Sequence, residues 1–485
     1  MTTSSSSSTA GPPSVRFGRQ STRGVLLGFS LPRVIAIGLS AIVVVIGLTV
    51  AGGMGFMIFA LVWAPLMASA LINVRGKPAI EWVSVAGQYW GRKQKGQTEF
   101  RSKPSKPRPA GTLALPGDAA SLRFYDDPLT GCVMVHDPHR NTISATLLVE
   151  HPAYVLLSPD EQVTRVSAWG RTLASLGQSG TCATLQVLEA TVPDPGVGVT
   201  GWYESHGVHD GGWADEAYRS LLEMTSSGSS THRTTITIAL DMGAAARAIT
   251  AAGRGMRGAA AVLSADMGAI EHSLRTTGLR VQHWLSASEL AAIVRAAYDP
   301  ASNVLPDGPG AKLETAGPIA ISEHWDRFRS DSGFSSVLWI SDWPRIDVPP
   351  SFLHSLVFSP GVRKSISIVT HPVGTTEALR SIRKEKTEAI SDSLQKAKIG
   401  QIEDLSDAQE YQDILDRERA LISGHVDVEF SGFIAISAPT EEALTAAVSQ
   451  IERAAAQAAC ETRILYGRQT QGFVVAALPL GRGVF

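Results

Sequence analysis

The hydrophobic pattern of the chain begins with residues 34–74, which contain no charged side chain and are bracketed by Arg33 and Arg75. One straight helix over this run would be roughly 61 Å long, about twice the ~30 Å hydrocarbon core of a membrane. Glycines at positions 52, 53 and 55 can accommodate a turn near its middle, which leaves two apolar stretches that suit one crossing each. The pattern therefore predicts a two-helix transmembrane hairpin at residues 31–75.

Basic residues surround this run on both sides. They are Arg16, Arg19, Arg23 and Arg33 before it, and Arg75, Lys77, Arg92, Lys93, Lys95, Arg101, Lys103, Lys106 and Arg108 after it. Because loops rich in Lys and Arg stay on the cytoplasmic side, both termini are expected in the cytoplasm, in a multi-pass protein of the inner (plasma) membrane. A cleaved signal peptide fits poorly, since the apolar run is too long. A buried hairpin of a soluble protein is the alternative.

The residues that follow the apolar run carry aromatic side chains. Trp82, Tyr89 and Trp90 lie within one short helical pattern, which predicts an interfacial helix whose rings sit among lipid headgroups. Together with Arg33 and Arg75, these three are the expected membrane-anchoring residues, in contact with the lipid bilayer. A core helix of the body that follows is the alternative.

Two segments have compositions that do not support a packed core. Residues 1–30 are rich in Ser and Thr and predict a disordered basic tail. Pro alternates with Lys and Arg after residue 101, which predicts an extended connection to the body. Residues 76–118 are therefore expected to form the interfacial helix and a Lys/Pro linker.

Beyond residue 118, alternating runs typical of strands are interleaved with helices that begin at Ser or Thr caps. A strand, a capped helix and a second strand occur in this order at residues 143–192 and again at 426–466. This recurrence predicts an α+β body of two lobes with ferredoxin-like antiparallel sheets. Turn-forming residues gather near residue 300, so the lobes are expected at 119–300 and 301–485.

Three further segments complete the predicted elements. Residues 375–398 are highly charged and helical in pattern, which predicts a helix that projects from the body or packs on another chain. Residues 196–212 contain several glycines and predict a loop. Residues 472–478 form a short apolar run and predict the last strand.

Charge is unevenly distributed, although the whole chain carries a formal net charge of -2. The first ~110 residues are strongly basic, which suits an anionic membrane surface. The body is acidic and has no basic stripe with interleaved aromatics, so no direct nucleic-acid binding is expected. Cys132, Cys182 and Cys460 form no C-x-x-C pair, as is typical of a reducing compartment.

A G-x-G-x-x-G motif at residues 253–258 is the sharpest candidate for nucleotide binding. A dinucleotide loop must follow a strand directly, whereas this motif lies about ten residues after the nearest predicted strand, in an Ala-rich helical stretch. Small-residue helix packing or a kink is favoured, so alanine at Gly255 or Gly258 is expected to be tolerated. No phosphate-binding G-x-x-x-x-G-K-[ST] loop occurs in the sequence.

Two groups of histidines are the remaining candidates for chemistry. They are His206, His209 and Asp210, and His136, Asp137 and His139. Neither group has a Cys or a separated third ligand, so solvated loop side chains are favoured over a metal site. No nucleophile elbow and no arrangement of Ser, His and Asp nominates a triad. We expect a protein with no catalytic residue, no cofactor and no metal, and therefore not an enzyme.

The order of the parts resembles a known family. The predicted hairpin ends in Asn73-Val74-Arg75-Gly76-Lys77-Pro78 and Glu81-Trp82, and this front end resembles the PrgI-like inner-membrane components of type IV secretion and conjugation machines. The body from Gly131 resembles the N-terminal, non-catalytic domain of type IV secretion ATPases. In that family a Gln, an aromatic residue and Leu-Pro-Leu-Gly precede the motor domain. Here residues 469–473, Gln-Thr-Gln-Gly-Phe, lead to Leu-Pro-Leu-Gly at residues 478–481.

The whole arrangement is similar to an actinobacterial family of conjugation-associated integral membrane proteins, in which the ATPase is a separate chain. The resemblance implies a scaffold, oligomeric within a complex, that docks this ATPase and other inner-membrane channel subunits. A surface would replace the covalent link to the motor, expected at residues 377–419 and 472–478 with Tyr466 and Phe473 as anchors. The alternative is a membrane-tethered nucleotide-binding regulator or transporter subunit that uses the glycine motif.

Overall fold

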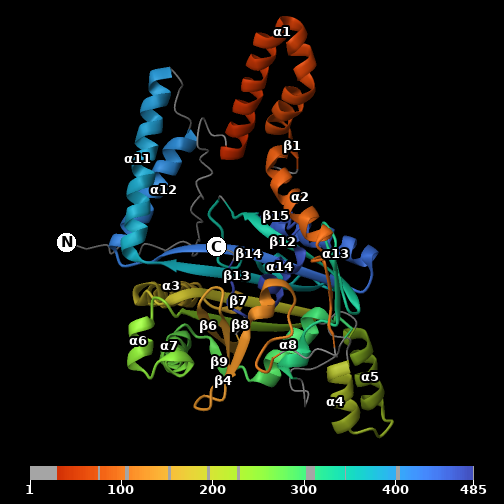
Figure 1. Ribbon diagram of the computed structural model, residues 1–485. Coiled ribbons are helices and arrows are strands. Elements are labelled where there is room, and N and C mark those ends of the chain that lie inside the picture. The colour runs from red at the N-terminus through yellow and green to blue at the C-terminus, as the bar shows by residue number, and fades with distance from the viewer. Residues whose placement is uncertain are drawn as a thin grey trace, which may run out of the picture. The chain divides into compact units, whose positions relative to one another are not determined.

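The computed structural model describes residues 30–74, 77–103, 109–150, 154–193, 197–226, 230–301, 312–344, 346–399 and 405–483 (Figure 1). The chain divides into two compact units. One, the N-terminal unit, comprises Arg19–Glu99 together with Tyr466–Arg468. The other, the body, comprises Phe100–Leu465 and Gln469–Phe485.

Helix α1, Leu31–Leu71, dominates the N-terminal unit. Its backbone is not helical at Ala51 and Gly52, where Gly52 has a φ of 55°, so the helix is kinked into two arms. The arms lie side by side in Figure 1, and the Ser40 hydroxyl of one arm donates a hydrogen bond of 3.3 Å to the Trp63 carbonyl of the other. By length and composition, α1 is the single helix of the described residues that could cross a membrane. The two crossings expected from the sequence stay a prediction.

Small side chains allow the two arms of α1 to approach. A Cβ placed on Gly55 would lie 1.9 Å from the Gly47 carbonyl oxygen, which no side chain could tolerate. A short ribbon of β1, Asn73–Val74, and β2, Lys77–Pro78, then leads into α2, Ala79–Gln94. The Ser30 hydroxyl donates a hydrogen bond of 2.6 Å to Glu81, which joins the start of α1 to the first turn of α2.

The body is built on one 13-stranded antiparallel sheet with the order β3-β10-β11-β12-β14-β13-β7-β8-β6-β5-β4, to which β15 adds beside β12 and β9 beside β6. The strands are β3 Glu99–Arg101, β4 Arg123–Asp126, β5 Val133–Asp137, β6 Thr142–Glu150, β7 Cys182–Pro193, β8 Ser230–Asp241, β9 Arg280–Trp284, β10 Ala320–Glu323, β11 Phe328–Ser330, β12 Gly333–Asp342, β13 Arg363–Val373, β14 Asp427–Ala438 and β15 Glu461–Ile464. The predicted mixture of helices and antiparallel strands is therefore confirmed, and the strands form one large sheet.

Helices connect the strands of the body. They are α3 Pro159–Ser179, α4 Val197–His206, α5 Trp213–Ser226, α6 Ala246–Ala251, α7 Gly255–Thr276, α8 Ala287–Tyr298, α9 Leu313–Ala316, α10 His354–Val357, α11 Thr375–Ile399, α12 Leu405–Ile422, α13 Glu441–Gln457 and α14 Gln469–Ala477, with short 3₁₀ helices at Gly117–Ser121 and Tyr154–Leu156. The expected Ser caps are present at Ser158 and Ser286, where each forms a capping box, with Glu161 and Glu289 respectively, and begins α3 and α8.

The strand order repeats within the body. The first repeat, residues 142–284, runs β6-α3-β7-β8-α7-β9 and orders its strands β9-β6-β8-β7 in the sheet. The second repeat, residues 333–464, runs β12-α10-β13-β14-α13-β15 with the matching order β15-β12-β14-β13. Strands β7 and β13 pair from Leu185 with Thr370 to Thr191 with Lys364. The expectation of a separate sheet in each lobe is wrong, because this pairing joins the two repeats into one sheet.

Both faces of the sheet carry helices. On β14, Phe433 and Ala435 lie in the core with α8 and α14, whereas the alternate residues Ile434 and Ile436 lie in the core with α13. Alternation along a strand directs these two pairs to opposite faces. The sheet is therefore a middle layer, and α14 lies on the face opposite the helices that connect the strands of each repeat.

Two predicted elements are corrected by the structure. The strand expected at 472–478 is helix α14, because a short apolar run that is buried throughout is compatible with either element. Gln469 is the first residue of α14. Its side chain accepts a hydrogen bond from the Val337 backbone N–H at 2.7 Å and donates one to the Leu465 carbonyl at 2.9 Å. The loop expected at 196–212 contains helix α4. Most of residues 299–310, the expected lobe boundary, lies outside the described residues.

Candidate functional site

The predicted membrane-anchoring residues occupy different environments in the N-terminal unit. The Arg33 guanidinium donates to the Asn73 side chain, and Arg75 lies outside the described residues. The Trp82 indole donates a hydrogen bond of 3.0 Å to the Val74 carbonyl. Tyr89 is buried, in contrast to Trp90, and the expected place of its ring among lipid headgroups stays a prediction.

Trp90 is the most exposed of the aromatic anchor candidates. Its side chain is 60% exposed, and Lys93 Nζ lies 5.7 Å from the ring centroid, a cation–π geometry. An exposed indole beside a lysine is the pairing expected at a membrane surface, where the ring and the cation both reach the headgroups. The role of Trp90 as a membrane anchor stays a prediction.

Tyr466, one of the two predicted partner anchors, contacts α2 within the N-terminal unit. Its ring packs edge to face on Trp82 with centroids 5.3 Å apart. The neighbouring residues of the same loop also bind α2, since Arg92 donates to the Gly467 carbonyl and Arg468 donates to Gln88 at 2.6 Å. The loop Tyr466–Arg468 is thus bound to α2 through ring packing and hydrogen bonds.

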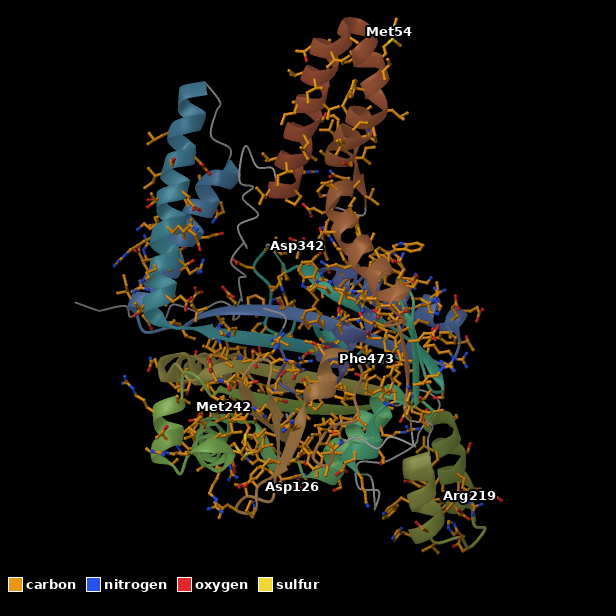
Figure 2. All side chains as sticks on the ribbon, in the orientation of Figure 1. Met54, Asp126, Arg219, Met242, Asp342 and Phe473 are labelled. Carbon is orange, nitrogen blue, oxygen red and sulfur yellow. The ribbon has the colours of Figure 1, made fainter. Side chains whose placement is uncertain are left out.

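Phe473, the other predicted anchor, is a core residue. It is 1% exposed and lies in α14, with its ring 5.0 Å from that of Tyr298 and 4.9 Å from that of Phe328 (Figure 2). The prediction that Phe473 and residues 472–478 form a partner-binding surface is wrong, because they are buried between the sheet and the helices around them.

The Leu-Pro-Leu-Gly segment that follows α14 lies across the strands of the first repeat. Gln186 on β7 donates to the carbonyls of Val475 and Leu478, each at 3.0 Å, and accepts from the Gly481 N–H at 2.8 Å. Thr146 on β6 donates to the Pro479 carbonyl at 2.8 Å. The polar side chains of the sheet thus satisfy a buried stretch of backbone that has no strand partner.

We call the side chains of β6 and β7 that bind residues 478–481 the seat of this segment. Arg482 comes directly after the residues that the seat binds. It is 7% exposed and binds Asp137 at 2.8 Å and Asp118 at 3.2 Å, so its buried charge is paired. Gly481 has a φ of 64° and lies against Thr237, where a Cβ would approach to 3.2 Å. These contacts explain the glycine and the arginine of the segment. The polar residues of β6 and β7 at alternate positions are the sequence signal that could have revealed the seat.

The glycine motif forms a turn between two helices, not between a strand and a helix. Residues 252–254 separate α6 from α7, and Arg254 and Gly255 both have positive φ values, 62° and 58°. A Cβ on Gly258 would lie 2.3 Å from the Ile249 carbonyl oxygen. The expected kink with small-residue packing is confirmed, but tolerance of alanine at Gly255 and Gly258 is wrong, for backbone and steric reasons respectively.

The two histidine groups are not assembled into a ligand set. His209 bonds to the Glu204 carbonyl and lies 3.2 Å from Arg219, while Asp210 accepts from the Gly212 N–H. Burial lowers the pKa of His136. Within the described ranges no group of three or more His, Cys, Asp or Glu side chains could hold a metal ion.

A cluster of ionisable side chains surrounds β7 and β13. Lys364 is buried, donates to the Ser359 carbonyl at 2.8 Å, and has a pKa lowered to about 8 by burial. Burial also lowers the pKa of Arg233 to about 10. Glu189 accepts from Thr234 and lies 3.1 Å from the His232 imidazole. The cluster places charges on the central strands but does not enclose a reactive group.

The charged segment 377–419 forms a self-contained pair of helices, α11 and α12. Apolar side chains along their seam are buried, among them Ile382 and Ile414. Lys386 binds Glu418 at 2.8 Å, and Arg417 binds both Glu385 at 3.0 Å and Asp427 of β14 at 2.6 Å. The pair is inserted between β13 and β14, and its exposed charged side chains include Lys384, Glu388 and Arg419.

Comparison with protein-family models and with curated proteins finds no match for this chain.

Proposed function

We propose that this protein is an inner-membrane scaffold of a type IV secretion-like conjugation apparatus, which transfers DNA or protein, and that it docks a separate ATPase. The observation that carries the proposal is the combination of a kinked apolar helix with a repeated α+β body that binds its own Leu-Pro-Leu-Gly segment. These are the parts on which the family resemblance of the sequence depends.

The two arms of α1 each cross the membrane once in this proposal, and both ends return to the cytoplasm. The kink at Ala51 and Gly52 and the contact between Ser40 and Trp63 support a hairpin. Exposed large apolar side chains along both arms suit lipid contact. Basic residues at both ends favour the cytoplasmic side.

The repeats of the body are two ferredoxin-like modules joined edge to edge in this proposal. Their matching strand orders support it, as does the pairing of the equivalent strands β7 and β13. Residues 478–482 follow the second module and bind to strands of the first, since Thr146 and Thr184 donate hydrogen bonds to their backbone carbonyls. The body would therefore present one rigid platform to its partners.

The ATPase docks on the outer face of α11 and α12, because α14 and Phe473 are buried and offer no surface. This face carries exposed charges such as Lys384, Glu388 and Arg419, which suits a polar interface with a few anchors.

Deletion of the helix pair tests this docking. Val373 and Asp427 are paired neighbours on β13 and β14, so a short turn can replace residues 375–424 without breaking the sheet. The full-length membrane protein with this deletion should lose co-purification of the type IV secretion ATPase from the same cell. Replacement of α4 and α5 between Pro193 and Ser230, which are likewise paired, is the matched control and should retain it. Retention of the ATPase by the first variant would contradict the assignment.

A further inference from the structure

The two repeats carry helix pairs at equivalent places, and the pairs differ in what they leave exposed. Helices α4 and α5 are inserted between β7 and β8, and α11 and α12 between β13 and β14. Because β7 and β13 are antiparallel neighbours, the insertions leave the sheet at opposite ends (Figure 1). The second pair packs around the buried side chains of Ile382 and Ile414 and is linked by ion pairs such as that of Lys386 with Glu418. The first pair exposes two tryptophan side chains among its described residues.

The tip of the first pair exposes large apolar side chains. Trp202, Val208 and Trp213 are 60%, 76% and 85% exposed, and they lie on the last turns of α4, the connecting loop and the first residue of α5. We call these three residues the aromatic tip. Exposed apolar patches rimmed by polar residues mark interaction sites, and tryptophan is enriched among the residues that dominate binding energy.

The aromatic tip is held in a fixed conformation by a buried carboxylate. Asp215 accepts hydrogen bonds of 2.8 Å from the Tyr203 hydroxyl and from Arg219 Nε, and its second oxygen accepts from the Gly211 N–H at 3.3 Å (Figure 2 labels Arg219). The Tyr203 ring packs on Tyr218 with centroids 4.7 Å apart. A tip fixed in this way is pre-organised for binding.

The charge around the tip is negative. Glu204, Asp210 and Glu216 are exposed and form no ion pair with a described residue. The single Arg or Lys of this helix pair, Arg219, is bound to Asp215, and the two histidines His206 and His209 lie beside Trp202 and Asp215 respectively. Three exposed carboxylates beside two indoles disfavour an anionic lipid surface. They favour a segment that combines basic and apolar side chains.

One stretch of this chain outside the described ranges has that chemistry. Residues 14–23, the arginine segment, contain Arg16, Arg19 and Arg23 with Val15 and Phe17 and no acidic residue. The other undescribed stretches lack one component, since 104–108 has no large apolar side chain and 302–311 and 400–404 have no basic one. We propose that the aromatic tip binds the arginine segment of this chain. The inference rests on the proposed topology in one respect, that tail and body share one side of the membrane.

Binding of a peptide to the full chain tests the proposal without depending on topology. A fluorescent peptide of residues 12–24 is titrated against protein that lacks residues 2–23 and is held in nanodiscs of zwitterionic lipid. We expect saturable binding that is weakened by salt, and weakened at least about tenfold by Trp202→Ala with Trp213→Ala. Replacing the three carboxylates with amides should weaken binding at low salt and flatten its salt dependence.

The matched control uses the other helix pair. Ile390→Ala with Leu394→Ala removes two exposed apolar side chains from α11 and should leave peptide binding unchanged. Absence of binding, or binding that the tip variants leave intact, would overturn the proposal. Concentration-dependent dimers that the tip variants abolish, without peptide binding, would also overturn it and would assign the tip to a second copy.

Discussion

At Gly258 the backbone of α7 approaches α6 so closely that a methyl group has no room. A Cβ there would lie 2.3 Å from the Ile249 carbonyl oxygen. Gly258→Ala should therefore destabilise the body by about 1–3 kcal/mol, because the two helices must separate. Gly268→Ala in the same helix is the control: nothing lies within 4 Å of its Cβ, so it should stabilise by up to about 1 kcal/mol. Urea unfolding of the purified protein measures both, and equal effects would contradict the steric account.

Lys364 gives the protein a specific pH dependence. Burial lowers its pKa to about 8 from an ordinary 10.5, so above pH 8 the folded protein releases this proton before the unfolded chain does. The unfolded state then binds more protons, and stability gains about 1 kcal/mol per pH unit from this residue until the unfolded pKa is reached. Compared with Lys364→Met, the wild-type urea midpoint should rise between pH 7.5 and 9.5. A constant difference over that range would show that Lys364 does not titrate there.

At the scale of elements, α14 and the segment after it bind the second repeat to the first. The two N–H groups of the buried Gln186 amide are shared among three acceptors, Ser367 Oγ and the carbonyls of Val475 and Leu478, and its carbonyl oxygen accepts from the Gly481 N–H. Gln186→Ala should cost several kcal/mol, because each polar group left buried without a partner costs about 1–3 kcal/mol. Exposed Gln282, which bonds only to Glu150 among the described residues, is the control.

Hydrogen exchange measures the effect of Gln186→Ala by element. We expect faster exchange in α14 and in residues 478–482, with α11 and α12 unchanged. Deletion of residues 472–485 should for the same reason destabilise the whole body. Unchanged hydrogen exchange in α14 after Gln186→Ala would show that the Gln186 side chain does not hold α14 and residues 478–482 in place.

The sequence was sufficient for elements whose signal is local. The uncharged run gave α1, and Ser158 and Ser286 gave the starts of α3 and α8, because caps act within one turn. Residues 472–478 were assigned to a strand because an apolar run has no period when every side is buried. The pairing of β7 with β13 depends on contacts far apart in the chain, and nothing local in either strand indicates it. The same holds for Tyr466, whose contact with Trp82 is long-range.

The candidate site was less predictable than the fold. Phe473 was chosen as an exposed anchor from its residue type, but residue type does not report burial. The aromatic tip was missed because the Gly-rich segment around it suggested a loop, whereas α4 and the Asp215 network give it a defined structure. Alternate polar residues on β6 and β7 were read as ordinary strand alternation.

At the scale of the whole molecule, the central claim is that α1 crosses the membrane twice and leaves the body in the cytoplasm. Met54 follows the kink and lies at the turn between the two arms (Figure 2). Intact cells, freed of any outer barrier, can be treated with a membrane-impermeant maleimide after cysteine is placed at Met54, at Ser5 or at Ser102. The wild-type chain, with its three native cysteines, sets the background. We expect Met54→Cys to be labelled from outside, and Ser5→Cys and Ser102→Cys to be labelled only after permeabilisation. Protection of Met54→Cys, or labelling of Ser102→Cys in intact cells, would contradict the account.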